Sequence, residues 1–141
     1  MASIDNVINA LSVALDSVFP NVDIYTKSVE QGFSEPCFFI KVLKSDLEQE
    51  LGRRYRKDIK VDIHYFSDKG ERDCYEVLEK LYVCLGTINL AERSLKAKKV
   101  SGEVIDGILH FFISFPHLVI EEKPTEIKMG KLEVNIINGK K

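Results

Sequence analysis

Apolar residues recur every three or four positions from Ser3 to Val18, and this spacing predicts an amphipathic helix at the start of the chain. Ser3 is a suitable N-cap, because its hydroxyl can accept a hydrogen bond from a free amide of the first turn. The helix should end at Phe19-Pro20, because a residue that precedes proline disfavours helical geometry. The apolar stripe consists of Ile4, Val7, Ile8, Leu11, Ala14, Leu15 and Val18.

A second helical stripe follows the polar segment Ser67-Asp68-Lys69-Gly70. Its apolar positions fall on one face, and Gly86 supplies a stop signal after Leu85. The sequence therefore predicts a helix between Gly70 and Gly86. Its stripe consists of Cys74, Val77, Leu78, Leu81, Tyr82 and Leu85.

Three extended segments lie between these helices. Residues 22–28 read as a short strand that ends before the turn-rich segment 31–36. In the strand 37–43 both alternating sets are apolar, which predicts an interior strand covered on both faces. In the strand 58–66 apolar and polar residues alternate, which predicts one buried face and one wetter face.

The connection between these two strands, residues 44–57, is polar and longer than a tight hairpin turn. We expect it to project from the domain as a strongly cationic loop, because it ends in the charged run Arg53-Arg54-Tyr55-Arg56-Lys57.

Asp106-Gly107 joins a short segment, 103–105, to the apolar segment 108–115. Asp-Gly tolerates the positive backbone torsions of a two-residue turn, so we predict a β-hairpin here. Beyond Pro124 a weak alternation through Ile127 to Ile136 is compatible with an edge strand.

The predicted order is helix, three strands, helix, two strands and a tail. Sequential strands interrupted by helices are typical of an α+β domain. We expect a mainly antiparallel or mixed sheet of four to six strands, with two helices packed on one face. Residues 3–122 should form a single domain, and residues 123–141 a C-terminal extension that is an edge strand or flexible.

Composition narrows the class of protein. The chain has 141 residues, of which 45% are apolar and 30% charged, as expected for one globular domain. A formal net charge of −2 argues against a protein whose main function is sequence-specific binding of nucleic acid. No apolar run is long enough to span a bilayer and no secretory signal is visible, so we expect no membrane association and an intracellular location.

Three cysteines without metal-ligand or redox spacing are expected to be free thiols in apolar surroundings: Cys37, Cys74 and Cys84.

The sequence gives little indication of catalytic or metal-binding residues. His64, His110 and His117 match no compact metal-ligand spacing, and ordinary strand positions explain them. Asp58 and Asp62 lie four apart on one predicted strand with Lys60 between them, as in some metal-dependent nucleases, although alternating charges on a wet face explain them more simply. We therefore predict no catalytic residue, no bound metal and no cofactor.

The charged run has two possible interpretations, a solvated loop or a contact surface. Arginine pairs with carboxylates in a forked geometry and tyrosine adds rigid apolar area, which suits docking against a neighbouring subunit. We therefore expect the charged run to be a protein contact surface, formed by Arg53, Arg54, Tyr55, Arg56 and Lys57.

Several strings, spread over residues 3–120, together resemble the tail terminator family of tailed phages and prophages of Gram-positive bacteria. They bear on the fold and are not an active-site signature. The strings are Ile8-Asn9-Ala10-Leu11, residues 31–40, Gly52-Arg53-Arg54-Tyr55, residues 62–66 and residues 106–112.

The resemblance implies a structural protein that caps the head-proximal end of the tail tube, usually as a six-membered ring, stops polymerisation and serves head–tail joining. It implies contacts with copies of itself, the major tail tube protein and a head–tail connector, first in the host cytoplasm and then in the virion tail. One hypothesis is that the charged run forms a subunit or tail-tube contact. A second hypothesis is that residues 132–137 add a strand to another subunit or to the tube protein. The alternatives are a small metal-dependent nuclease and another tail-completion or adaptor protein. Acidic residues that could meet the charged run are Glu48, Glu50, Asp68, Glu71 and Asp73.

Overall fold

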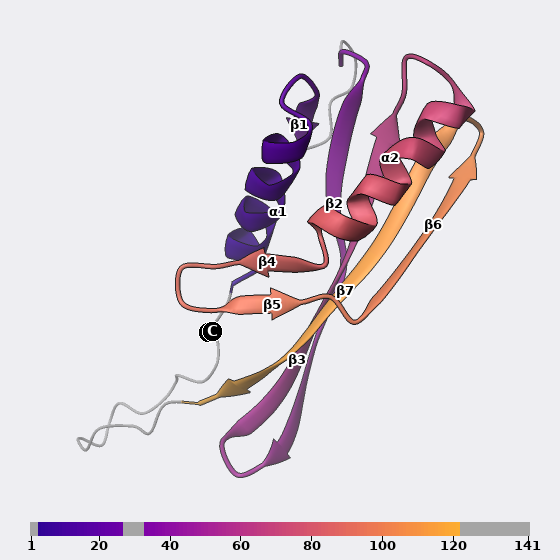
Figure 1. Cartoon of the computed structure of the whole chain (residues 1–141). Helices are drawn as coiled ribbons and strands as arrows, with labels where there is room; N and C mark the ends of the chain where they lie inside the picture. The colour runs from indigo at the N-terminus through magenta and orange to yellow at the C-terminus, as the bar shows by residue number, and fades with distance from the viewer. Residues whose placement is uncertain (1–2, 27–32, 122–141) are drawn as a thin grey trace.

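The computed structural model describes residues 3–26 and 33–121. They form a five-stranded sheet in the order β1-β2-β3-β7-β6, a separate two-stranded sheet and two helices (Figure 1). The elements in chain order are α1 (Ile4–Val18), β1 (Asp23–Tyr25), β2 (Cys37–Leu51), β3 (Arg54–Phe66), α2 (Glu71–Cys84), β4 (Thr87–Asn89), β5 (Ser94–Lys96), β6 (Lys99–Ile105) and β7 (Ile108–Ile120).

Both predicted helices are present. The side chain of Ser3 caps α1 by accepting a hydrogen bond from the Asn6 backbone N–H at 3.1 Å. The helix ends at Val18 with Phe19 as its C-cap, as the following proline predicts. The second helix begins after Gly70 and ends at Cys84, with Leu85 as its C-cap.

The sheet is mixed, because β1 runs parallel to β2 while the other neighbouring pairs are antiparallel. The longest uninterrupted register joins β3 to β7 over thirteen residues, from Arg54 opposite Ile120 to Phe66 opposite Ile108. The β6–β7 turn has positive φ at Asp106 (53°) and Gly107 (78°), as predicted for its Asp-Gly sequence. The expected α+β class and the number of strands are confirmed.

Both helices cover the same face of the sheet. The odd-numbered residues from 59 to 65 on β3 and from 109 to 115 on β7 point into one buried cluster. To this cluster α1 contributes Val7, Leu11 and Leu15, and α2 contributes Leu78 and Leu81. No described helix covers the even-numbered face. The largest fully buried side chains include Phe38, Ile59, Ile63, Phe111 and Phe115.

Four strands are longer than predicted, among them β6, which begins at Lys99 and not at residue 103. β2 continues to Leu51 and does not stop at Leu43, and β3 begins at Arg54, so the expected loop 44–57 is mostly paired strand. β7 continues to Ile120. The prediction that residues 37–43 are covered on both faces holds for the first residues but is wrong for Leu43, which is 49% exposed.

A small hairpin formed by β4 and β5 was not predicted. Each of its strands has only one buried residue, Ile88 and Leu95, so the sequence carries no alternating pattern to reveal it. The predicted C-terminal extension, including residues 132–137, lies outside the described residues.

Gly102 on β6 allows α2 to approach the sheet. A Cβ atom at this position would lie 2.5 Å from Leu78 Cδ1 and 3.1 Å from Leu78 Cδ2. Leu78 is itself 8% exposed and belongs to the core cluster, so it has little room to move. The close contact between α2 and β6 therefore requires a residue without a side chain at position 102.

We predict that Gly102→Ala lowers the free energy of unfolding by about 1–3 kcal/mol, because the added methyl group overpacks the α2–β6 contact. Urea denaturation measures the loss. In a Leu78→Ala background the same substitution should cost much less, because the opposing methyl groups are absent. Gly86→Ala is the matched control, since the nearest atom there is 3.6 Å away. Equal losses at positions 86 and 102 would contradict the packing argument.

Candidate functional site

The β2–β3 hairpin extends beyond the part of the sheet that the helices cover (Figure 1). We call its outer part, residues 44–58, the arm. Gly52, with φ of 60°, and Arg53 form the turn at its tip. Backbone pairing with β7 supports the arm from one side, up to Arg54 opposite Ile120. The arm is thus an ordered ribbon, and the prediction of a projecting loop is wrong about its secondary structure.

The charged run is divided between the two faces of this ribbon. Arg53 lies in the turn, and Arg54 and Arg56 project from the face that the helices leave uncovered. All three side chains are exposed. Tyr55 and Lys57 project from the opposite face and are half-buried. Burial lowers the pKa of Lys57. The five candidate contact residues therefore do not form one patch.

Carboxylates balance the cations of the arm. Arg56 donates a hydrogen bond from Nε to Glu50 Oε2 at 2.9 Å, within the same ribbon. The arm is therefore not strongly cationic, and Arg56 already has a partner. Its five cations and four carboxylates are Lys44, Arg53, Arg54, Arg56 and Lys57, and Asp46, Glu48, Glu50 and Asp58.

Exposed apolar side chains accompany the arginines at the tip. Leu51, Arg54 and Ile120 lie directly opposite one another on three neighbouring strands. Leu51 is 75% exposed and Ile120 is 63% exposed. Arg54 thus lies between two exposed aliphatic side chains, with Arg53 next to it. Such a combination of apolar and charged groups is typical of protein–protein contact surfaces.

The expected acidic partners differ in their surroundings. Asp73 accepts hydrogen bonds from the hydroxyls of Tyr65 (2.7 Å) and Ser67 (2.6 Å). Burial raises the pKa of Asp73, but these hydrogen bonds outweigh it and leave the pKa below its usual value. Asp73 therefore holds the start of α2 in place. Asp68 and Glu71 are exposed near the same helix start.

The two carboxylates of the nuclease alternative do not converge. Asp58 and Asp62 lie on the same face of β3, as their spacing predicts, but four strand residues separate them by about 13 Å. Two-metal sites hold their ions about 4 Å apart, so these side chains cannot share such a site. Lys60, between them, is exposed.

The histidines are arranged differently from the prediction. His64 and His110 are direct cross-strand partners, and Asp62 projects from the same face two residues before His64. One ligand atom from each of the three residues lies within 4.8 Å of the other two. His117, by contrast, projects from the opposite face. His64 and His110 lie on strands, as expected, but their sequence spacing did not show that strand pairing would bring them together.

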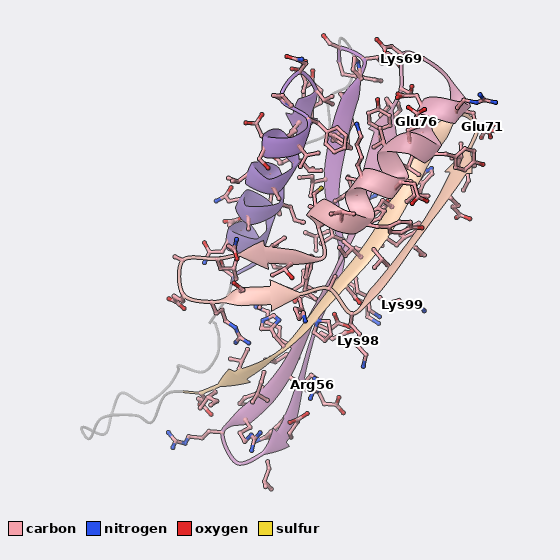
Figure 2. All side chains as sticks on the ribbon, viewed as in Figure 1. Arg56, Lys69, Glu71, Glu76, Lys98 and Lys99 are labelled. Carbon is pink, nitrogen blue, oxygen red and sulfur yellow. The ribbon has the colours of Figure 1, made fainter. Side chains whose placement is uncertain are left out.

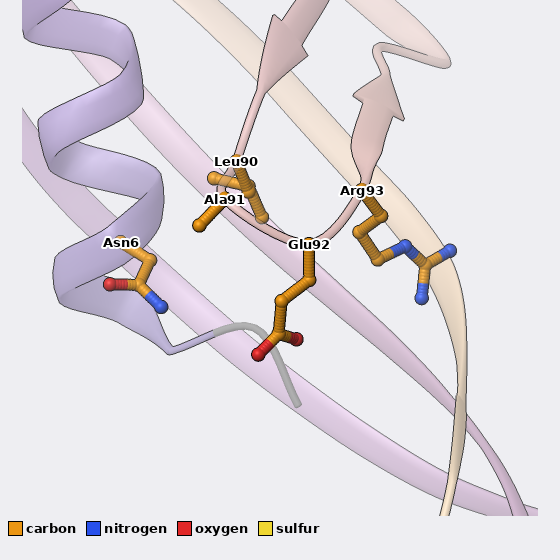
Figure 3. A pocket seen from close by; sticks show the side chains of 5 residues that line it. All are labelled: Asn6, Leu90, Ala91, Glu92 and Arg93. Atoms are coloured by element: carbon orange, nitrogen blue, oxygen red, sulfur yellow. The ribbon is translucent and has the colours of Figure 1, made fainter.

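One pocket lies between the first turn of α1 and the β4–β5 connection (Figure 3). Its volume is about 30 Å³, far below the roughly 300–1,000 Å³ of small-molecule sites. It has room for water but not for a substrate. Its lining residues are Asn6, Leu90, Ala91, Glu92 and Arg93.

A family model described as "Phage tail terminator protein" matches residues 6–127, most of the chain. The chain belongs to the phage tail terminator family. It is thus a structural component of a phage tail, as the resemblance implied. The match does not bear on the host, so Gram-positive origin stays a prediction.

No curated protein gives a significant match to this tail terminator. One similar solved structure is 14% identical, with a TM-score of 0.47, and the alignment covers 88% of this chain and 99% of the other. A likeness at this level adds nothing to the family assignment. In the part of the chain that the structure describes, neither helix is long and apolar enough to cross a bilayer.

The cysteines of this tail terminator are free thiols, as predicted. Burial raises the pKa of Cys37 to about 11, with a smaller effect from Glu35, and burial also raises the pKa of Cys74 and Cys84. A thiol with a raised pKa carries little thiolate at neutral pH, and the thiolate is the nucleophile. These three side chains therefore serve packing.

His117 gives the protein a pH-dependent stability. It is 5% exposed, and its Nε2 has no hydrogen-bond partner among residues 3–26 and 33–121. Burial lowers its pKa and outweighs the hydrogen bond with the Phe115 carbonyl, which raises it, while Arg93 and Lys57 lower it further. In the unfolded chain the pKa returns to about 6.5. The unfolded state therefore binds more protons below pH 6.5, and stability falls as the pH decreases from 6.5 toward the lower folded-state pKa.

We predict that His117→Gln reduces this loss of stability on acidification. Urea denaturation at pH 7.5 and pH 5.5 measures it, and one histidine contributes at most about 1.4 kcal/mol per pH unit. His64 and His110 are present in both proteins, so the difference between the two curves isolates His117. Parallel pH profiles for the two proteins would refute the prediction.

Proposed function

We propose that this tail terminator forms a ring that closes the head-proximal end of the tail tube. In this role it stops tube polymerisation and provides a surface for head joining. Its partners are copies of itself in a six-membered ring, the major tail tube protein and a head–tail connector. It assembles in the host cytoplasm and remains in the virion tail. The family match over residues 6–127 carries this proposal.

The shape of the subunit supports a ring. A closed ring needs two different patches on each subunit, one of which meets the other patch on the next subunit. The tip of the arm and the start of α2 lie at opposite ends of the long sheet, as the positions of Arg56 and Glu71 in Figure 2 show. Asp68 and Glu71 are exposed carboxylates at that far end. A head-to-tail contact between such ends generates a ring when the rotation closes.

The arm tip supplies the groups that such a contact uses. Arg54 is exposed and can make forked hydrogen bonds to a carboxylate. Arg53 is exposed too, and it makes only a long hydrogen bond, 3.5 Å from Nη1 to the backbone carbonyl of Glu121, so its other donors can face a partner. Leu51 and Ile120 add apolar area that becomes buried when a partner covers it. We assign the contact to these four residues. Arg56 and Tyr55 have a smaller part, because the first is paired with Glu50 and the second is half-buried.

A non-enzymatic role agrees with the chemistry of the surface. Asp58 and Asp62 are too far apart for the nuclease alternative, so no specific observation favours that enzyme. The net charge of −2 also suits a ring through which a genome passes, because an acidic protein does not grip DNA.

We predict that the double variant Arg53→Glu/Arg54→Glu loses ring formation and tube capping, because it places carboxylates where the contact needs cations. Native mass spectrometry reports the ring, and electron microscopy of tubes grown from the tail tube protein reports capping as tube length. Wild-type protein should shorten the tubes at least tenfold more effectively than the variant.

The matched control is Lys98→Glu/Lys99→Glu, which changes the net charge equally at two exposed lysines away from the arm (Figure 2). It should cap tubes like the wild type. Normal capping by the arm variant would remove the arm contact while leaving the tail role intact. Failure of the wild-type protein to act on tubes at all would refute the tail-capping function itself.

A further inference from the structure

Three potential metal ligands meet on the uncovered face of the sheet. Nε2 of His64 lies 2.7 Å from Asp62 Oδ2, and Nδ1 of His110 lies 3.9 Å from the same oxygen. The two imidazole rings are in contact, with centroids 4.3 Å apart. The register of β3 and β7 fixes this arrangement, because it places His64 directly opposite His110. The cluster therefore depends on regular sheet geometry and not on a loop.

Asp62 is unusual for a residue on an open sheet face. It is only 6% exposed, and its Oδ1 is buried without a hydrogen-bond partner among the described residues. A buried carboxylate oxygen without a partner is costly, and such groups are normally paired or bound to a metal. Oδ1 of Asp58, on the same face, is likewise without a partner among the described residues, so what distinguishes Asp62 is its deeper burial together with the two imidazoles beside it.

Aromatic side chains border the cluster. Phe112 lies directly opposite Asp62, and its ring stacks on that of His110 with an interplanar angle of 14°. Phe39 lies directly opposite His64 on the other neighbouring strand. An apolar border of this kind limits the access of water and strengthens the interaction of a bound cation with its ligands.

We propose that Asp62, His64 and His110 bind a divalent transition-metal ion of the zinc class. Two imidazoles and one carboxylate favour zinc, cobalt or iron(II) over magnesium or calcium, which prefer ligands made of oxygen alone. Ligand atoms around a tetrahedral zinc lie about 3.3 Å apart, so the observed separations need only small rotations of the side chains. Binding requires the ring proton of His64 to sit on Nδ1, leaving Nε2 with a lone pair. Three protein ligands leave one position for water or an external group.

A purely structural role is the competing explanation. In it, His64 donates a hydrogen bond to Asp62 and His110 packs beside the pair, without any ion. This arrangement satisfies Oδ2 but leaves Oδ1 unpaired. The two explanations make opposite predictions for metal binding.

The test uses the untagged full chain after removal of metals. Isothermal titration calorimetry with zinc should show one ion per chain at micromolar or tighter affinity, and cobalt should give the intense visible absorption of a four-coordinate site. Asp62→Asn and His110→Ala should each weaken zinc binding at least tenfold, because each removes one of the three ligands. Circular dichroism of the variants shows whether they fold, and His64→Gln provides an independent third variant.

Two controls match the ligand variants. Asp58→Asn makes the same chemical change as Asp62→Asn on the same face of β3, and Cys84→Ser removes the half-exposed thiol. Both should keep wild-type affinity. The absence of saturable binding to the folded wild-type chain would overturn the proposal, and so would an equal loss of affinity in the controls. The result is independent of ring formation, so it does not test the tail-capping role.

Discussion

The pairing of β3 with β7 determines the arrangement of nearly every important side chain in this protein. Its thirteen-residue register is uninterrupted, so the odd-numbered residues of both strands stay on the helix side along their whole length. A slip of one residue would move each of these side chains to the other face. The same register produces the buried pair Ile59 and Phe115, the pair His64 and His110, and the exposed pair Arg54 and Ile120. Core, candidate metal site and arm tip are thus three sections of one ladder.

The strands are longer than the layer of helices that covers them, and this mismatch separates two tasks. Where α1 and α2 lie over the sheet, the buried cluster provides the hydrophobic stabilisation of the domain. Beyond Ile59 the strands continue without helices above them, and their backbone hydrogen bonds with one another keep the ribbon ordered. Surface residues there can change without disturbing the core.

The sequence predicted the elements that have an apolar stripe. Both helices, the Asp106-Gly107 turn and the α+β class follow from periodicity and turn chemistry, and they agree with the structure. The arm was taken for a loop because its β2 half is exposed along its whole length, so residues 44–57 show no apolar alternation. Backbone pairing holds it, and this leaves little trace in the sequence. The Asp62-His64-His110 cluster depends on register between distant segments, although the spacing of Asp62 and His64 already placed those two on one face.

The outer edge of β2 has a further consequence for this protein. β1 pairs with it only at Cys37–Phe39, and no other described strand covers the edge from there to Leu51. Open backbone donors and acceptors invite indiscriminate aggregation. Along this edge the charged residues Lys41, Lys44, Asp46, Glu48 and Glu50 resist it, because a second copy must bring their charges into unfavourable proximity or remove them from water. The open edge of β2 is therefore protected against unspecific pairing with a second copy of the chain.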